Sequence, residues 1–178
     1  WSCEPRPRRA CRVDTFRAIV DKRDQRAFLP RPIPEDALRR ILQAGRMTGS
    51  SKNREPNRFV VVRDGGRLAA IAALGRQARW LADAAALIAI VQTERHEYDA
   101  GRCAQNMMLA AWGDGIGSCP AHVPEAELGA LLGVPAGLHV NRVIGFGYID
   151  PERAGPPRSV GRRRLPLEEL THWEGWRP

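Results

Sequence analysis

The sequence predicts an α+β fold in which helices pack against a sheet. Helix-like and strand-like patterns follow one another along the 178 residues without the strict strand–helix–strand alternation of a parallel sheet. Hydrophobic residues make up 43% of the chain, which is enough for one domain with its own core. The chain contains no internal repeat and no apolar run of about eighteen residues, so we expect no membrane span.

The first residues precede any regular pattern. Residues 1–11 contain no apolar core of a signal peptide. We interpret them as a disordered leader or an expression remnant in front of one domain at 12–178. Residues 13–23 then carry apolar side chains at the spacing of one helix face.

The clearest helix is predicted at 34–45. Pro34 suits its first turn, two acidic residues follow at the positive end of the helix dipole, and Gly45 can end it. Residues 47–57 have the composition of a loop. Residues 58–64 are predicted to form a strand, because β-branched residues dominate them.

The remaining elements follow in the order helix, helix, strand, helix, strand or loop, helix and strand. They are expected at 66–74, 76–83, 85–93, 99–113, 115–123, 124–134 and 138–149. The strand at 85–93 is apolar throughout and should be buried. A segment rich in Pro and Gly at 155–164 then leads to a short helix or tail at 165–176.

The net charge of +8 is concentrated at the two ends of the chain. Residues 1–31 carry +5, residues 151–178 carry +2, and the residues between them carry +1. A module that binds nucleic acid more often spreads its cations along one face of an element, so a basic polyanion-binding function is disfavoured. Lys22, Arg23 and Arg26 follow the end of the first predicted helix. Either these cations are solvated at the end of a helix, or they bind an anion.

No set of side chains marks a catalytic or metal centre. The four cysteines form no CxxC pair, the four histidines lack ligand spacing, and no GxSxG elbow is present. Free thiols are typical of a cytoplasmic protein, and we expect Cys119 to be a small buried residue instead of a redox thiol. A core with glycine-lined turns and basic clusters, but without catalytic side chains, suits a protein whose cofactor does the chemistry.

Five motifs in a fixed order carry a resemblance to a known family. They are KRDQRAF, IPEDALRRILQAGRMTGSSKNREPNRFVVV, DAGRCAQNMMLAAWGDGIGSC, VIGFGY and GRRRLPLEEL. In this order they resemble the nitroreductase family of flavoenzymes over about residues 15–176. The resemblance implies a nitroreductase-like fold, with a mixed, mostly antiparallel central sheet flanked by helices. It also implies a homodimer with two FMN sites across its interface.

The resemblance further implies which residues hold FMN. Two basic segments would bind its phosphate and ribityl chain, the turn after a strand would border its ring, and a loop would reach it from the partner subunit. The implied residues are Lys22, Arg23, Asp24, Arg26, Arg162 and Arg164 for the phosphate end, Pro120, Ala121 and His122 for the ring, and Gly49, Ser50, Ser51 and Asn53 for the loop. Because Pro120 has no N–H group, Ala121 or His122 would donate to the ring.

The activity implied by the resemblance is that of an FMN-dependent oxidoreductase. NADPH or NADH would reduce the flavin, and the flavin would reduce a small-molecule acceptor such as a nitroaromatic or a quinone. No catalytic side chain and no metal is implied, because N5 of the flavin is the reactive atom.

Three residues depart from the family pattern. Asp24 stands where a serine is usual, Glu55 replaces a glutamine, and Asn57 replaces an aromatic residue. An acidic group beside a phosphate is unfavourable unless it orients Arg23 or Arg26. These departures leave an alternative open, in which a flavin enzyme dehydrogenates a peptide or cyclic dipeptide with oxygen as the acceptor.

Overall fold

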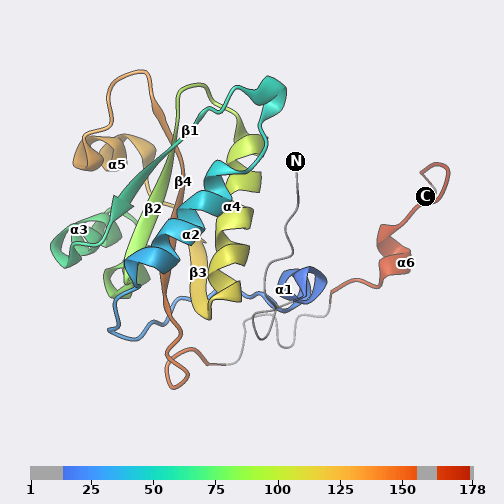
Figure 1. Ribbon diagram of the computed structural model, residues 1–178, viewed down its shortest axis with the longest axis horizontal. Helices are drawn as coiled ribbons and strands as arrows, with labels where there is room; N and C mark the ends of the chain where they lie inside the picture. Colours follow the sequence, from blue (N-terminus) through green and yellow to red (C-terminus); the bar gives the residue numbers. More distant parts are fainter. Residues whose placement is uncertain (1–13, 156–163, 177–178) are drawn as a thin grey trace, which may run out of the picture.

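The computed structural model of the chain describes residues 14–155 and 164–176, and it shows a sheet covered by helices on both faces (Figure 1). The elements are α1 (Thr15–Asp21), α2 (Glu35–Arg46), η1 (Ser51–Asn53), β1 (Asn57–Val62), α3 (Gly65–Leu74), η2 (Arg79–Asp83), β2 (Ala86–Gln92), α4 (Glu97–Gly113), β3 (Ile116–Ala121), α5 (Glu125–Leu132), β4 (His139–Tyr148) and α6 (Leu167–Leu170). The leader predicted at 1–11 lies outside the described residues. Among the described helices, none combines the length and the apolar character that crossing a bilayer requires.

The sheet has four antiparallel strands in the order β1-β2-β4-β3. All seven residues of β2 are buried, because helices cover both of its faces, and this explains its continuous apolar sequence. An isolated parallel bridge joins Asp24 to Ser118 at the outer edge of β3. The predicted α+β fold with a mostly antiparallel central sheet is confirmed.

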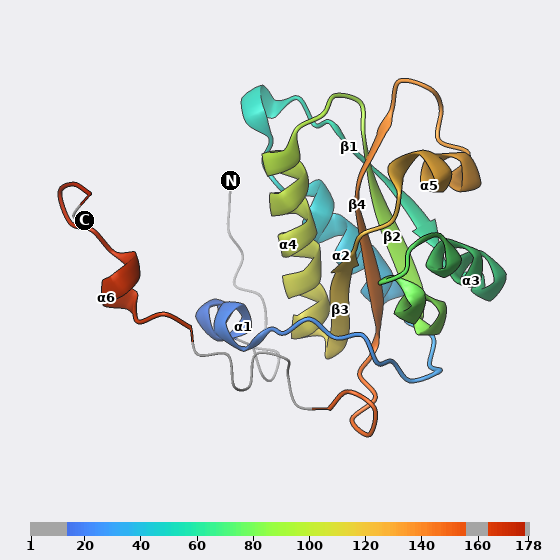
Figure 2. The ribbon, with the colours of Figure 1, turned by 180° about the vertical axis from the view of Figure 1, so that it is seen from behind.

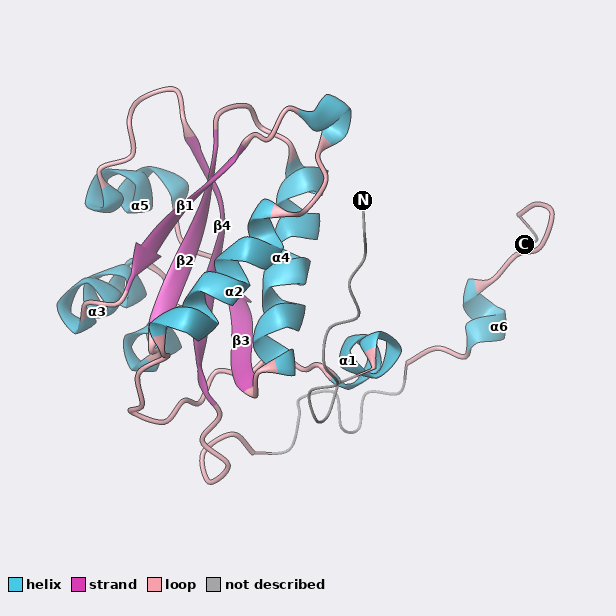
Figure 3. Cartoon of the chain, in the orientation of Figure 1, coloured by secondary structure: helices cyan, strands magenta, loops and turns pink. Residues whose placement is uncertain are grey.

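Helices lie on both sides of the sheet, which gives three layers (Figure 3). A separate hydrophobic core lies between the sheet and the helices on each side. α2 and α4 cover one face, where Ile41 and Met107 are fully buried. α3, η2 and α5 cover the other face, where Leu81 and Leu128 are fully buried. Successive residues of a strand point to opposite faces, so each strand contributes to both cores.

One predicted helix differs from the structure. Residues 76–83 were expected to form a short helix, but only a 3₁₀ turn, η2, is present at Arg79–Asp83. Its residues pack closely on β4, since a Cβ added to Gly145 would lie 2.6 Å from the ring of Trp80 and 2.7 Å from Leu81. Tertiary packing therefore decides the conformation of this segment.

A buried aromatic residue fixes the segment that follows α1. Phe28 is 1% exposed and lies against Gly147 of β4, where an added Cβ would approach the ring within 2.6 Å. The backbone N–H of Leu29 donates to the carbonyl oxygen of Tyr148 at 2.8 Å. Glycine is required at 147 because of this close approach. The segment from α1 to Phe28 consequently runs along the edge of β3 (Figure 2).

Candidate functional site

One arginine of the basic stretch completes α1 itself. The helix ends at Asp21, and Nη1 of Arg23 donates to the carbonyl oxygens of Val20 and Lys22, the latter at 2.9 Å. Carbonyl groups at the end of a helix lack an intrahelical partner, so a nearby cation stabilises them. Arg23 therefore fits the interpretation of the stretch as a helix end.

Lys22 is enclosed, and it faces the body of the protein. Its side chain is 8% exposed, and its ammonium group pairs with the carboxylate of Asp24. The same nitrogen lies 3.5 Å from Sδ of Met108 in α4. The carboxylate of Asp24 thus pairs with Lys22, and not with Arg23 or Arg26, whose orientation was the condition under which an acidic group would suit this position.

Arg26 and Asp24 attach this segment to β3. The backbone of Asp24 forms the parallel bridge with Ser118, and the N–H of Gln25 donates to the carbonyl oxygen of Ser118 at 3.0 Å. Nε of Arg26 donates to Sγ of Cys119 at 3.2 Å. We call the set formed by Lys22, Asp24, Arg26, Ser118 and Cys119 the β3 corner.

The two β3 residues of the β3 corner, Ser118 and Cys119, are buried. Ser118 is 1% exposed, and its hydroxyl has no hydrogen-bond partner in the part of the chain that the structure describes. Cys119 is fully buried. Burial raises the pKa of its thiol, although the hydrogen bond from Arg26 opposes the shift. A neutral buried thiol is a poor nucleophile, so the prediction of a small buried residue is confirmed.

The β3 corner suits the phosphate end of a cofactor. An ammonium group, a guanidinium group and an unpaired hydroxyl are the kinds of donor that phosphate oxygens accept. An unpaired buried hydroxyl costs roughly 1–3 kcal/mol, and an oxygen that accepts from Ser118 would remove this cost. The carboxylate of Asp24 is the one group in the corner that disfavours an anion.

The residues predicted to border the ring follow directly on the β3 corner. Pro120, Ala121 and His122 line a pocket of about 290 Å³, and residues 140–143 of β4 form its other wall. Sγ of Cys119 lies 3.3 Å from the carbonyl oxygen of Pro120, so the pocket adjoins the contact made by Arg26. The structure therefore brings the predicted phosphate segment 22–26 next to the predicted ring segment.

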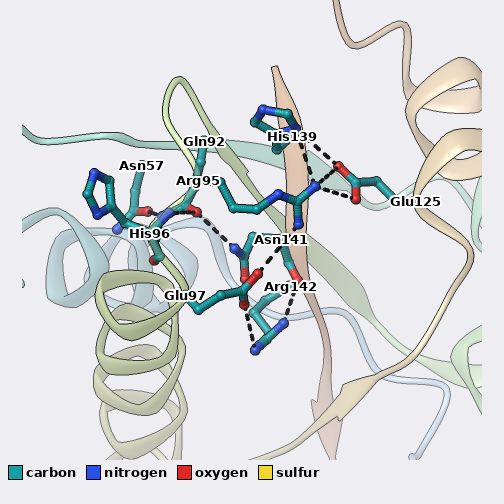
Figure 4. A network of polar contacts seen from close by, with 9 residues as sticks. All are labelled: Asn57, Gln92, Arg95, His96, Glu97, Glu125, His139, Asn141 and Arg142. Atoms are coloured by element: carbon teal, nitrogen blue, oxygen red, sulfur yellow. Dashed lines mark hydrogen bonds and ion pairs between the residues drawn. The ribbon is translucent and has the colours of Figure 1, made fainter. Parts of the chain in front are cut away.

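A buried glutamine connects this region to the start of α4 (Figure 4). Gln92 is fully buried. Its Nε2 donates to Oδ1 of Asn57 at 2.8 Å and to the carbonyl oxygen of His96 at 3.1 Å. Its Oε1 accepts from the backbone N–H of His96 at 3.0 Å and from Nδ2 of Asn141 at 2.8 Å. The amide of Gln92 is thus fully satisfied, and it holds β1, β4 and α4 together.

Charged side chains surround the same network. Nη2 of Arg95 contacts both carboxylate oxygens of Glu125, at 3.1 and 2.8 Å. This hydrogen bonding lowers the pKa of Glu125 and raises the pKa of Arg95. Arg142, which lines the pocket, pairs with Glu97 of α4 at 3.0 Å. The pair of Arg142 and Glu97 fixes the pocket wall of β4 to α4, and the pair of Arg95 and Glu125 joins the segment before α4 to α5.

The loop at 49–53 lies at the opposite end of α4 from α1 (Figure 1). The carbonyl oxygen of Gly49 accepts from Arg102 at 3.0 Å, and the N–H of Ser51 donates to Asp99 at 3.1 Å. Oγ of Ser50 accepts from the N–H group of residue 55 at 2.9 Å.

The backbone of this loop is strained. Lys52, Asn53 and Glu55 all have φ near +50°, which is unusual for residues other than glycine. The chain itself does not bring the loop to the β3 corner, as Figures 1 and 2 show.

Of the two arginines predicted in the second basic segment, the structure describes Arg164. Arg162 lies outside the described residues. Arg164 is exposed at the start of the described C-terminal segment, which extends away from the sheet and its helices (Figure 2).

A larger cavity of about 570 Å³ lies elsewhere, beside Phe28, and none of the predicted site residues lines it. Its wall includes Arg153, but this guanidinium is already paired with Asp83 at 3.0 Å and with Asp150 at 2.7 Å. We therefore place the candidate site at the smaller pocket, because Pro120 and Ala121 of its wall directly follow Ser118 and Cys119 of the β3 corner in the same strand.

Sequence reasoning missed two parts of the site. Ser118 carries the unpaired hydroxyl, and Met108 closes over Lys22 from a position 86 residues away in the chain. A single serine in a strand and a methionine on an apolar helix face carry no local signal of a site.

Comparison with known proteins adds independent evidence. The model of the nitroreductase family matches residues 19–94 and 71–148 of the chain. A protein of Archaeoglobus fulgidus named "Putative NADH dehydrogenase/NAD(P)H nitroreductase" is 28% identical over 153 residues, which cover 79% of this chain and 88% of that protein.

Solved structures show the same fold. The "FMN-dependent Nitroreductase" from Clostridium difficile has a TM-score of 0.79 at 22% identity, and the match covers 90% of this chain and 99% of that one. The NADPH:FMN oxidoreductase from Vibrio harveyi, complexed with NAD+, has a TM-score of 0.77 at 22% identity, with coverage of 92% and 78%.

Proposed function

Because the chain belongs to the nitroreductase family, we propose that it is an FMN-dependent oxidoreductase that uses NADPH or NADH to reduce a small-molecule acceptor. A nitroaromatic compound or a quinone is the acceptor class that we propose. The observation that supports this function most directly is the β3 corner, whose cationic donors and unpaired hydroxyl lie at the strand residues that directly precede the pocket residues Pro120, Ala121 and His122.

The residues of the β3 corner would bind and orient the cofactor. Lys22 and Arg26 would hold the phosphate of FMN, and the hydroxyl of Ser118 lies on the strand residue that bridges to this segment. Arg23 would act indirectly, since it stabilises the end of α1 and so positions Lys22. Arg162 and Arg164 remain the proposed second cationic segment.

The pocket would receive the flavin ring. Pro120 offers no N–H, so the backbone of Ala121 or His122 would supply the hydrogen bond that orients the ring edge. When bound, FMN supplies the redox chemistry between the nicotinamide and the acceptor. The polar network around Gln92 would keep the pocket wall in place, because it ties β4 to α4.

We propose a homodimer in which the loop at 49–53 reaches the flavin of the partner subunit. The loop is held in a strained conformation at the end of α4, and the side chains of Ser51 and Asn53 are exposed. Apolar side chains of α1 and the C-terminal segment are also uncovered in the single chain. They are Phe16, Ile19, Val20, Leu165, Leu167, Leu170, Trp173 and Trp176. Burial of such side chains against a second copy would stabilise a dimer.

The proposal is tested by the absorbance spectrum of the purified full-length chain after incubation with FMN and desalting. We expect the spectrum of oxidised flavin to remain with the protein and to bleach when NADPH or NADH is added without oxygen. Comparison of the two nucleotides identifies the reductant. A protein that stays colourless after FMN is offered would contradict the proposal.

A second candidate function rests on Asn57. By the resemblance an aromatic residue is usual here, but in this chain Oδ1 of Asn57 accepts from the buried Gln92 at 2.8 Å. Through Gln92 this hydrogen bond reaches Asn141 in the pocket wall, and the change suits the alternative reaction, the dehydrogenation of a peptide or cyclic dipeptide with oxygen as the acceptor. Oxygen uptake with such a substrate, in the absence of any nicotinamide, would favour this alternative over the first proposal.

A further inference from the structure

The carboxylate of Asp24 is paired with Lys22, the cation that an incoming phosphate would need. Lys22 is 8% exposed at its side chain, and its ammonium group is paired with Asp24. The remaining contact of this nitrogen is the sulfur of Met108 at 3.5 Å. Little of the ammonium group is therefore left for a second anion while Asp24 keeps its position.

The neighbouring cations do not replace Lys22. Nη1 of Arg23 is engaged with two backbone carbonyl oxygens of α1. Arg26 adds one guanidinium group, and its Nε already donates a hydrogen bond to Sγ of Cys119. Together, Lys22, Asp24 and Arg26 present a net charge of only +1 to a ligand, whereas a bound phosphate monoester carries close to two negative charges.

The carboxylate of Asp24 weakens the binding of a flavin only if the ribityl chain of that flavin ends in a charged phosphate. A phosphorylated flavin must either displace Asp24 from Lys22 or bind beside it, and both cost free energy, because two like charges at close range repel each other. Riboflavin lacks the phosphate and meets no such repulsion. Its ribityl hydroxyls can instead donate to the carboxylate.

We propose that Asp24 is a specificity-determining residue that competes with the flavin phosphate for Lys22, so that the site discriminates only weakly between FMN and riboflavin. The inference rests on the proposed function, since it assumes that the pocket beside the β3 corner binds a flavin. It adds that the phosphate contributes little net affinity in this chain, because repulsion by Asp24 offsets the attraction of Arg26.

The test compares dissociation constants for FMN and for riboflavin, measured by quenching of flavin fluorescence on the full-length chain freed of any copurified flavin. Asp24→Asn removes the charge but keeps an oxygen that can accept from Lys22. Asp24→Ser is a second variant in case the first fails to fold. Asp21→Asn is the matched control, because Asp21 is also an exposed carboxylate of this segment but pairs with Arg17 at 3.5 Å.

We expect the wild-type chain to bind the two flavins with dissociation constants within about tenfold of each other. Asp24→Asn should lower the dissociation constant for FMN by roughly tenfold or more and change that for riboflavin by less than about twofold. Asp21→Asn should leave both dissociation constants unchanged.

An unchanged ratio in both Asp24 variants, or a weaker binding of FMN, would overturn the inference while leaving the proposed function intact. A failure of every variant to bind either flavin would overturn both.

Discussion

Arg26 is the cation of the β3 corner that is best placed to bind an anion. Its Nε donates to Cys119, while the terminal nitrogens of its guanidinium group carry no hydrogen bond within residues 14–155 and 164–176. Lys22, in contrast, is already paired with Asp24, and Arg23 caps α1. The three cations of one short stretch thus have three different roles.

The first prediction concerns this arginine. Arg26→Ala should weaken FMN binding by about ten- to a hundredfold, because a hydrogen bond between charged groups contributes about 1.5–3 kcal/mol. Riboflavin binding should change less. Fluorescence titration measures both, and Arg17→Ala is the control, since Arg17 is exposed and pairs only with Asp21. Equal losses of FMN affinity in Arg26→Ala and Arg17→Ala would exclude a specific contact between Arg26 and the phosphate.

The second prediction concerns the thiols. Burial raises the pKa of Cys103 to about 11 and also raises the pKa of Cys119. In a variant with Cys3→Ser and Cys11→Ser, no thiol should react with a disulfide reagent near neutral pH until denaturant is added. Rapid reaction of a thiol in the folded variant would show that one of these two cysteines is accessible.

At the scale of the element, β4 connects the fold to the site. Its glycines at 145 and 147 allow Trp80 and Phe28 to lie directly on the strand. Phe28 in turn anchors the segment that carries Lys22 and Arg26. A change in β4 should therefore affect both the stability of the fold and the binding of the cofactor.

The third prediction tests this connection. Gly147→Ala should destabilise the protein by about 1–3 kcal/mol, because the new Cβ would lie 2.6 Å from the ring of Phe28. It should also weaken FMN binding. Gly129→Ala is the control, since its Cβ would meet Val140 only at 4.0 Å and alanine favours the helix. Urea unfolding measures stability, and equal midpoints for both variants would contradict the packing argument.

The fourth prediction concerns the ion pair between Arg95, in the segment before α4, and Glu125 of α5. The pKa of Glu125 is lowered by its hydrogen bond from Arg95, so this pair stabilises the folded state at pH values above the ordinary pKa of a glutamate. The contribution is lost as the pH falls through the lowered pKa. Because the pair is solvent-exposed, we expect at most about 1 kcal/mol.

Glu125→Gln provides the measurement for this pair. The difference in unfolding free energy between wild type and variant should be present at neutral pH and vanish in acid. A difference that grows as the pH falls would contradict the assignment.

On the scale of the whole molecule, the elements were predictable because their signals are local. Pro34 marks the start of α2, and the apolar run of β2 marks an interior strand. The expected end at Gly45 is wrong, because the helix continues to Arg46 and Gly45 packs against Met107 and Phe59. The 3₁₀ turn at Trp80 was not predictable, since its conformation depends on contact with a distant glycine.

The same reasoning applies to the site. Its basic residues and its turn were visible in the sequence, whereas the contacts that join them were not. Lys22 meets Met108 across 86 residues, and Arg26 meets Cys119 across 93. Orientation of Arg23 or Arg26 was the one role in which Asp24 would suit a phosphate site, and only the folded chain shows that its partner is Lys22.

The fifth prediction concerns the proposed dimer. In one chain the loop at 49–53 and the β3 corner lie at opposite ends of α4, so we propose that each flavin site combines parts of two copies (Figure 1). Arg26→Ala and Ser51→Trp should each weaken FMN binding as homodimers. When the two variants are unfolded together and refolded as a mixture, about a quarter of the sites should regain wild-type affinity, because each mixed dimer contains one intact site. If no wild-type affinity is regained, the loop at 49–53 and the β3 corner belong to the same site within one chain, which contradicts the proposal.

The most direct test of the central claim is a crystal structure of the chain with FMN bound. The account predicts the phosphate within hydrogen-bonding distance of Arg26 and Lys22, the ring in the pocket at Pro120, Ala121 and His122, and the loop carrying Ser51 supplied by the second copy. A phosphate bound away from these two cations, or a ring outside that pocket, would contradict the account.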